Sequence, residues 1–485
     1  MARHGWNANV RGWRLAALLG VGLVLLALVL TLVDTGPGDG PGDGPGGGGK
    51  NGIAGTSPDG DKVHGDPVVP PGAPAPRVGW GFTHTQYSAD DGEDAAVERV
   101  RAELAGQGRP VPQIQHLMGW GAGNPEPVKG RYAFAAMDDR IDFVRASKGT
   151  PVVTLCCAPD WMKGGRPGAD NTDWSQAALE KAPERAHYAD FARLAATVAK
   201  RYPDVRHFLV WNEFKGFWND AEARWDYEGY TELYNLVYKE LKKVDADIMV
   251  GGPYLPMSSL DPRRTGGSSK ELTGPWGSLD QRVLDAFAYW NRHKAGADFV
   301  VVDGASYTDD DEMLPDEFRA TDKFTAVGRW LRERTGDLPL WWAEYYVEPG
   351  DSEDDRDGWT EPHRAAVHAA GLIAMAEGGA TSGFYWNPQK KDGDACAGCL
   401  WTSTRRPDGG AALPMLRLVE RFGKEFGPGT RYETVPVDAG ARDDVRVLAD
   451  DDAVLVVNTR DRHVDAKVDG HRVGLPGYGV QWLER

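Results

Sequence analysis

Cysteine is scarce in this sequence, with four residues among 485. Four cysteines are too few for a disulfide-rich scaffold. Cys396 and Cys399 lie in a Gly-rich loop without a second C-x-x-C pair or a nearby histidine, so the pattern does not indicate a zinc site. Outside the cell a loop disulfide is expected for this pair. Cys156 and Cys157 are adjacent within an apolar run and are expected to be small core residues.

Positive charge is also in deficit, because 55 Lys and Arg face 72 Asp and Glu and give a formal net charge of −17. Such a surface repels phosphate backbones, so a nucleic-acid partner is not expected. The sequence has no H-E-x-x-H pair, no nucleotide-binding loop and no nucleophile elbow. Metal-dependent, ATP-dependent and esterase chemistry therefore lack support, and we expect no cofactor, no metal ion and no particular protein partner. The acidic runs at 309–312 and 351–357 are expected to be solvated loops rather than calcium sites.

Long apolar runs are absent apart from one near the N-terminus. Residues 15–33 form a run of 19 uncharged residues, close to the roughly 20 that span a bilayer as a helix. Arginines precede it and aspartates follow it, so we expect a transmembrane signal-anchor with residues 1–14 in the cytoplasm and the rest outside the cell membrane. Secretion after signal-peptide cleavage is the alternative, although no small-x-small cleavage site is evident. Residues 34–76 are rich in Gly, Pro and Asp and are expected to form a disordered linker.

The remaining chain has two parts. In residues 77–427, short apolar runs alternate with amphipathic helical segments, the pattern of repeated βα units. A Gly-rich turn would follow the first strand of a nucleotide-binding open sheet, and residues 83–86 read Thr-His-Thr-Gln instead. We therefore predict an α/β fold of the (β/α)8 TIM-barrel type. Residues 428–485 show only strand patterns separated by Asp/Gly turns and predict a small antiparallel, sandwich-like β domain that packs on the barrel.

The expected barrel strands are residues 78–83, 111–117, 151–155, 207–211, 248–251, 299–302, 338–343 and 381–386, and the helices include 188–201, 227–243, 278–292, 324–335, 362–377 and 413–426. The expected strands of the β domain are residues 432–437, 445–449, 453–458, 463–468 and 480–483.

Two glutamates directly follow apolar strand segments. Residues 207–213 end in Glu213 and residues 338–344 end in Glu344. The carboxyl ends of the strands form the active face of such a barrel, and strands four and seven lie across it from one another. Glycoside hydrolysis needs two carboxyl groups, one to protonate the leaving oxygen and one to meet the anomeric carbon. For either glutamate alone, an ion pair at the rim is the alternative.

The motif Trp-Asn-Glu at residues 211–213, together with Glu344 ending strand seven, resembles the clan-A (β/α)8 retaining glycosidases. Within that clan it is most similar to glycoside hydrolase family 39, the β-xylosidases and α-L-iduronidases. Further matches are Gly-Gly-Pro at residues 251–253, Pro-Asp-Trp-Met at 159–162 and Trp386 ending strand eight. The resemblance covers residue 77 to the C-terminus, since those enzymes also append a β domain.

The resemblance implies a role for four residues. Glu213 would be the general acid/base and Glu344 the nucleophile. Asn212 would hydrogen-bond the sugar 2-hydroxyl, to which an amide offers both a donor and an acceptor. Trp386 would form the floor of the subsite where cleavage occurs.

The sequence also departs from the family pattern. After Glu213 it reads Phe-Lys-Gly, where the family often has Pro-Asn, which leaves the substrate class open. On strand six, Asp303 stands where the family has a histidine, and Tyr307 comes two residues late. Tyr307 is still expected to approach the nucleophile. His84, His116 and Trp161 are further substrate-binding candidates, with hydrogen bonding inside the protein or core packing as the alternatives.

These features together predict a hydrolase that cleaves an extracellular poly- or oligosaccharide with retention of configuration. Retention predicts carboxyl groups about 5–5.5 Å apart, rather than the ~6.5–9.5 Å of inverting enzymes. Two other functions fit the same residues: a transglycosylase that uses a sugar acceptor in place of water, and an inactive membrane-tethered barrel that binds glycan.

Overall fold

The computed structural model describes residues 67–264, 266–350, 358–390, 396–438 and 440–485. The predicted membrane helix at 15–33, the segment before it and most of the predicted linker at 34–76 lie outside these ranges. Residues 67–76 contain neither helix nor strand. Among the helices in the described ranges, none is long and apolar enough to cross a membrane.

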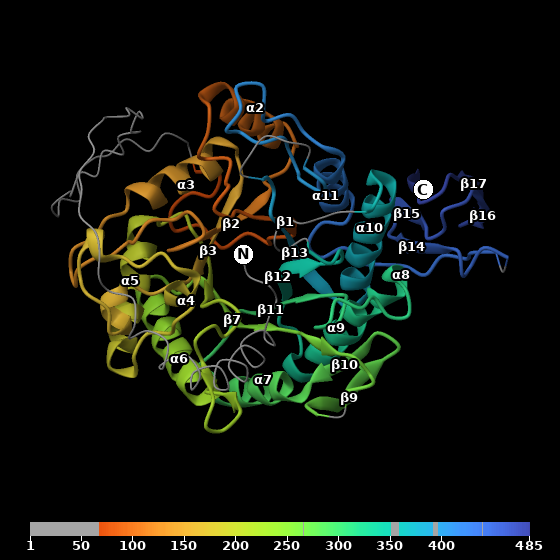
Figure 1. The fold of residues 1–485 in the computed structure, drawn as a ribbon. Coiled ribbons are helices and arrows are strands. Elements are labelled where there is room, and N and C mark those ends of the chain that lie inside the picture. Colours follow the sequence, from red (N-terminus) through yellow and green to blue (C-terminus); the bar gives the residue numbers. More distant parts are fainter. Residues whose placement is uncertain (1–66, 265, 351–357, 391–395, 439) are drawn as a thin grey trace, which may run out of the picture.

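Eight parallel strands close into a barrel in the order β1-β13-β12-β11-β7-β4-β3-β2. Helices surround this ring on the outside (Figure 1). The predicted (β/α)8 barrel is thereby confirmed. The strands are β1 (Trp80–Thr83), β2 (Pro112–His116), β3 (Thr150–Leu155), β4 (His207–Val210), β7 (Met249–Pro256), β11 (Phe299–Ala305), β12 (Leu340–Tyr346) and β13 (Ala380–Trp386). The helices that follow them in turn are α2 (Asp94–Ala105), α3 (Ala135–Ala146), α5 (Tyr188–Arg201), α6 (Tyr227–Val244), α7 (Gln281–His293), α9 (Asp322–Thr335), α10 (Glu361–Glu377) and α11 (Pro414–Glu425).

Side chains from the strands form their own apolar cluster, which fills the barrel. Ile114, Val152, Leu209, Val301 and Phe384 each come from a different strand of the ring and are almost completely buried. Strands buried on both faces need apolar residues at successive positions, which explains why their sequences show apolar runs rather than strict alternation. The packed interior gives the strand ends a rigid base.

Three strands end later than predicted, since β12 also runs to Tyr346 instead of ending at residue 343, and a small sheet was missed. β7 continues to Pro256 and β11 to Ala305, so Gly251–Pro253 does not end strand five and Asp303 lies inside strand six. The helix predicted at 278–292 begins only at Gln281, because residues 277–280 form β10. Strand β10 (Gly277–Asp280) is the centre of a three-stranded sheet with β8 (Ser259–Leu260) and β9 (Ser268–Gly274).

The C-terminal domain has two small antiparallel sheets, one with β14 (Val445–Ala449), β15 (Ala453–Asn458) and β18 (Val480–Glu484) and the other with β16 (Val464–Val468) and β17 (His471–Leu475). Apolar side chains of both sheets share one cluster, as in a sandwich. The predicted strand at 432–437 is wrong, since only single bridges form at Glu433 and Val437. Strand β17 was missed, although the turn that joins it to β16 is Asp469-Gly470, both with positive φ, a pair typical of hairpins.

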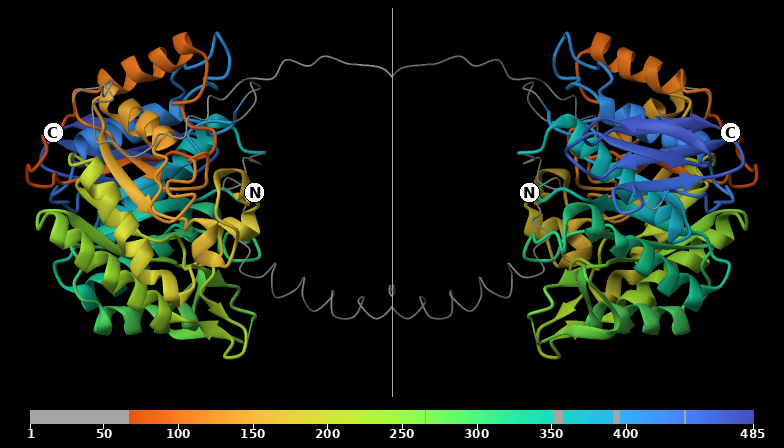
Figure 2. Two further views of the ribbon diagram at one scale, coloured as in Figure 1. Left: turned by 90° about the vertical axis from the view of Figure 1, so that its left-hand side faces the viewer. Right: turned by 90° about the vertical axis from the view of Figure 1, so that its right-hand side faces the viewer.

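The three-stranded sheet of this domain packs on the barrel rather than standing apart. Helix α10 contacts β14, β15 and β18, and the side views show the sheet lying against the helices (Figure 2). Leu448 and Leu455 belong to the same continuous apolar cluster as the barrel helices. The packing role predicted for this domain therefore agrees with the structure.

All four cysteines are paired in disulfides. Cys396 is bonded to Cys399, as predicted. Cys156 and Cys157 are fully buried as predicted, but they are bonded to each other rather than free. An apolar pattern indicates burial and carries no information about oxidation, so this second pair was not predicted.

Candidate active site

Glu213 is held by a tight turn directly after β4. Trp211, Glu213 and Phe214 all have φ values between 47° and 70°, a left-handed conformation that costs non-glycine residues of the order of 1–3 kcal/mol each. The indole N–H of Trp211 donates to the carbonyl of Lys215 at 2.8 Å and closes the turn. Such strained backbone is typical of functional sites, and here it fixes the direction of the Glu213 side chain.

Glu344 lies near the end of β12 and accepts three hydrogen bonds. The Asn212 amide donates to its Oε1 at 3.1 Å. The Tyr254 hydroxyl donates to the same oxygen, and the Tyr346 hydroxyl donates to Oε2. The carboxyl is 2% exposed. These donors fix its orientation and favour its ionised form.

Glu213 and Glu344 converge with a third carboxyl group, that of Asp303. One carboxylate oxygen from each of the three lies within 4.8 Å of the others. Asp303 and Glu344 are register partners on the adjacent strands β11 and β12, so their side chains leave the sheet on the same side. These oxygens are the atoms that could hold a cation, since oxygen ligands suit hard metal ions, although an ammonium group already neutralises part of their charge.

That ammonium group belongs to Lys215, whose side chain is 15% exposed. Its Nζ contacts the Glu213 carboxylate and donates to Asn212 Oδ1 at 2.9 Å. It also lies 5.2 Å from the ring centre of Trp120. Lys215 therefore connects the two residues that the Trp-Asn-Glu motif contributes to the site.

Burial and charge shift the protonation of this cluster. Burial, and next the charge of Glu213, raise the pKa of Glu344 to about 7, against the effect of Lys215 and the two tyrosine hydroxyls. Burial and the charges of Glu213 and Glu344 raise the pKa of Asp303 well above its usual value. Burial by itself would lower the pKa of Lys215, but the charges of Glu213 and Glu344 outweigh it and raise that pKa. Lys215 therefore stays charged beside the carboxyl groups.

Aromatic side chains form one wall beside these carboxyl groups. Trp386, at the end of β13, is 7% exposed and belongs to a cluster with Tyr307 and Tyr346. The His116 ring lies edge-on to Trp386 at 6.0 Å and stacks on Trp120 at 4.7 Å. Burial lowers the pKa of His116 to about 3, so the ring is neutral at physiological pH. Trp386, Tyr307 and His116 are thus brought together, as neutral rings.

His84 is instead engaged by the protein itself. Its Nε2 lies 2.9 Å from Gln113 Oε1, and its Nδ1 is in contact with the Ser88 hydroxyl. Burial lowers its pKa to about 4. With both ring nitrogens occupied, His84 fits the alternative of a structural hydrogen-bonding residue.

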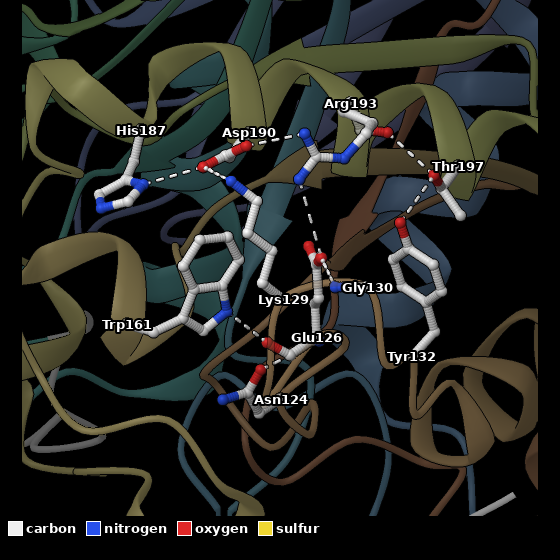
Figure 3. Close-up of polar contacts among 10 residues, drawn as sticks. All are labelled: Asn124, Glu126, Lys129, Gly130, Tyr132, Trp161, His187, Asp190, Arg193 and Thr197. Atoms are coloured by element: carbon white, nitrogen blue, oxygen red, sulfur yellow. Dashed lines mark hydrogen bonds and ion pairs between the residues drawn. The ribbon is translucent and has the colours of Figure 1, made fainter. Parts of the chain in front are cut away.

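Trp161 lies in a different polar network, between the loops that follow β2 and β3. Its indole N–H donates to the Glu126 carbonyl at 2.8 Å, and its ring meets His187 edge-on at 5.3 Å (Figure 3). Asp190 joins this network through hydrogen bonds with His187 and Lys129. The network fixes the orientation of Trp161, but none of these contacts involves the three carboxyl groups.

Four residues of the cluster were not assigned a role from the sequence: Asp303, Lys215, Tyr254 and Tyr346. Asp303 and Lys215 were visible only as departures from the family pattern. Tyr254 directly follows the Gly-Gly-Pro motif and has a positive φ, and the register between β7 and β11 shifts beside it. Tyr346 lies two residues after Glu344 on the same strand and so on the same face, a signal that period-two reasoning could have used.

The comparisons with known proteins find matches only among solved structures. No protein-family profile and no curated protein matches the sequence. A monomeric β-xylosidase from Caulobacter crescentus is similar with a TM-score of 0.50 and 18% identity, over 82% of this chain and 77% of that one. SrfJ from Salmonella typhimurium is similar with a TM-score of 0.55 and 12% identity, over 85% and 90% of the two chains.

A conserved exported protein from Bacteroides fragilis is similar with a TM-score of 0.54 and 12% identity, over 87% of this chain and 99% of that one. Sequence identities this low show that the folds are similar, but they do not show that the activity is shared. In its fold, this chain resembles the clan-A (β/α)8 glycoside hydrolases.

Proposed function

We propose that the protein is a retaining O-glycoside hydrolase that acts on a poly- or oligosaccharide, with xylosidase-like chemistry suggested by the family resemblance. The observation that carries the proposal is the approach of the Glu213 and Glu344 carboxylates, with oxygens within 4.8 Å. Inverting enzymes separate their two carboxyl groups by ~6.5–9.5 Å to leave room for a water molecule. Oxygens this close favour direct attack by one carboxylate on the sugar.

In the first step, an oxygen of Glu344 forms a bond to the anomeric carbon while the bond from that carbon to the leaving oxygen breaks. Glu213 gives its proton to the leaving oxygen. Asn212 is placed beside Glu344 and can meet the sugar 2-hydroxyl, while Trp386 offers an aromatic face for the C–H edge of the sugar. In the second step, Glu213 takes a proton from water, and the resulting hydroxide oxygen displaces Glu344 with net retention.

The division of roles can be tested with chromogenic aryl glycosides. Glu344→Gly should abolish turnover, because the bond to the anomeric carbon can no longer form. Glu213→Ala should still be glycosylated by a substrate with a good leaving group and should accumulate the glycosyl-enzyme. Azide, which needs no general base, should then restore turnover and give a glycosyl azide of retained configuration. Glu98→Ala, an exposed glutamate on α2, is the control and should keep full activity.

Four outcomes would change the assignment. An azide product of inverted configuration from Glu213→Ala would exchange the two roles. Full activity in either variant would place the catalytic pair elsewhere. Transfer to added sugar at the expense of hydrolysis would identify a transglycosylase, and binding of glycan without turnover would identify an inactive barrel.

The sequence pattern supports a location outside the cytoplasm, with residues 15–33 as a membrane anchor and residues 34–76 as a linker. Protease treatment of intact membranes should release an active fragment that begins near residue 77, since a Gly/Pro/Asp-rich linker is cut before a packed barrel. Active protein in the medium without protease, with a new N-terminus near residue 33, would favour a cleaved signal peptide instead.

A further inference from the structure

The two-step mechanism uses two carboxyl groups, but the site contains three. Asp303 has no exposed surface, and its register partner on β12 is Glu344. An oxygen of its carboxyl also lies within 4.8 Å of an oxygen of the Glu213 carboxyl.

Four donors near Asp303 have other acceptors. The hydroxyls of Tyr254 and Tyr346 donate to Glu344, and Lys215 contacts Glu213 and Asn212. Lys323, on α9, donates to the Ala305 carbonyl at 2.7 Å and to Ser259 Oγ at 3.0 Å.

Among the described residues, no amide, hydroxyl or ammonium group donates to either carboxylate oxygen of Asp303. An ionised carboxylate that is fully buried without a donor is strongly disfavoured. A protonated Asp303, in contrast, can donate to the nearby carboxylate of Glu213, whereas both oxygens of Glu344 already accept hydrogen bonds from other residues. The geometry therefore favours a proton between these two groups.

We propose that Asp303 and Glu213 share one proton. Asp303 is then a positioning residue: it keeps this proton available to the acid/base Glu213, although the positive charge of Lys215 favours the ionised form of Glu213. The expected kinetic behaviour rests on the proposed glycosidase function, whereas the shared proton does not. Two carboxyl groups in contact cannot readily ionise together, so a pair holds one proton to higher pH than a single carboxyl does.

The proton can be followed through the reaction. In the resting enzyme the proton is on Asp303 and hydrogen-bonded to Glu213. Glu213 also forms an ion pair with Lys215. As the substrate binds, the O–H bond at Asp303 breaks and one forms at Glu213. Glu213 then passes the proton to the leaving oxygen, which leaves both carboxyl groups ionised beside Lys215. In the second step the proton removed from water returns to the pair, so the cycle closes without any added reactant. The raised pKa of Asp303 agrees with this resting state.

Infrared spectroscopy can test the shared proton without any assay of activity. The wild-type protein in D2O at neutral pH should show the carbonyl stretch of a protonated buried carboxyl, and Asp303→Asn should lose that component. Glu420→Gln is a matched control, because Glu420 is a partly buried carboxyl on α11 whose burial raises its pKa to about 7. It should lose a different component and leave the kinetics unchanged.

The kinetic test compares two leaving groups. In Asp303→Asn, removal of the neighbouring acid lets Lys215 and the new amide favour ionised Glu213. The alkaline limb of kcat/KM for an alkyl glycoside should then move down by about one pH unit or more, roughly a tenfold loss above neutral pH. An aryl glycoside with a good leaving group, which needs little protonation, should keep its rate. The double variant Asp303→Asn/Lys215→Met should move the limb back toward higher pH.

Several results would overturn the proposal. One is an unchanged carbonyl band in Asp303→Asn, and another is an equal loss on both substrates at every pH. A third is a band that appears only after EDTA, together with activity that depends on added Mg²⁺ or Ca²⁺, since this would make the three carboxylates a cation site. If no glycoside is cleaved at all, the infrared result still decides the shared proton, and only the proposed function fails.

Discussion

The carboxyl of Glu344 is subject to opposing influences. Asn212, Tyr254 and Tyr346 donate hydrogen bonds that favour the carboxylate. Burial and the charge of Glu213 favour the neutral acid and prevail, so the pKa of Glu344 reaches about 7. A free glutamate titrates near 4.3. In its proposed role as nucleophile, Glu344 therefore becomes ionised only as the pH approaches neutrality.

We therefore expect kcat/KM for an aryl glycoside with a good leaving group to rise as the pH increases through about 7, since only ionised Glu344 attacks. Glu213→Gln removes the nearby like charge, lowers the pKa of Glu344 and should move this acid limb to lower pH. Tyr346→Phe removes a donor to the ionised form and should move the limb to higher pH. A limb that stays in place in Glu213→Gln would mean that another group controls it.

At this scale the sequence identified the residues that directly follow apolar strands. Glu213 and Glu344 could be predicted because each ends such a run at the active face. Asp303 and Tyr254 could not be assigned, because shifts in the pairing of β11 with β12 and of β7 with β11 determine where their side chains point. Register irregularities of this kind depend on contacts between strands and leave no periodic signal in one sequence.

At the scale of elements, α10 is tied to the segment that follows β12 by a buried ion pair. Arg364 donates to both carboxylate oxygens of Glu348, at 2.5 and 2.7 Å. Both side chains are at most 5% exposed. This pair fixes the chain just beyond Glu344, so it links a surface helix to the position of the Glu344 carboxyl.

Removing one partner of this ion pair should strongly destabilise the folded protein. Arg364→Met leaves Glu348 buried without its cation and should lower the free energy of unfolding by about 3–5 kcal/mol in urea titrations. The double variant Arg364→Met/Glu348→Gln should recover part of that loss. Arg406→Met, from an exposed pair with Asp408, should change stability by less than about 1 kcal/mol. Equal effects of the buried and exposed arginines would contradict this account.

Most barrel elements could be predicted because their period is regular. The predicted helix at 188–201 coincides with α5, and the predicted final helix differs from α11 by one residue at each end. The sheet of β8, β9 and β10 could not be predicted, because its strands are short and lie in a connection where the βα rhythm leads one to expect only a helix. β17 was missed for a similar reason, as a five-residue strand with one apolar position in two.

At the scale of the whole molecule, the β domain and the barrel share one apolar core. Trp482 of β18 packs against Phe426 at 5.4 Å and Phe422 at 6.5 Å between ring centres. The indole N–H of Trp80 in β1 donates to the carbonyl of Phe426 at 2.8 Å. The first strand of the barrel, its last helix and the C-terminal sheet are therefore connected through a few aromatic residues.

We expect Trp482→Ala to lower the free energy of unfolding by about 2–3 kcal/mol, toward the low end for a large-to-small change because the ring is only partly buried. Barrel and β domain should still unfold in a single transition. Trp174→Ala, at a tryptophan that is 50% exposed, is the matched control and should change stability by about 0.5 kcal/mol or less. Two separate transitions in calorimetry would show that the shared core does not couple the two parts.

The placement of Glu344 and Tyr346 two residues apart on β12 has a further consequence. Because one strand carries both Glu344 and a donor to it, a movement of β12 displaces them as one unit. Glu213 follows β4, which is three positions away from β12 in the barrel order, so the same movement changes its distance from Glu344. In the proposed mechanism, substitutions in the outer helices would therefore alter the hydrolysis rate through the distance between Glu213 and Glu344. The hydrogen bond between Tyr346 and Glu344 within β12 would change less.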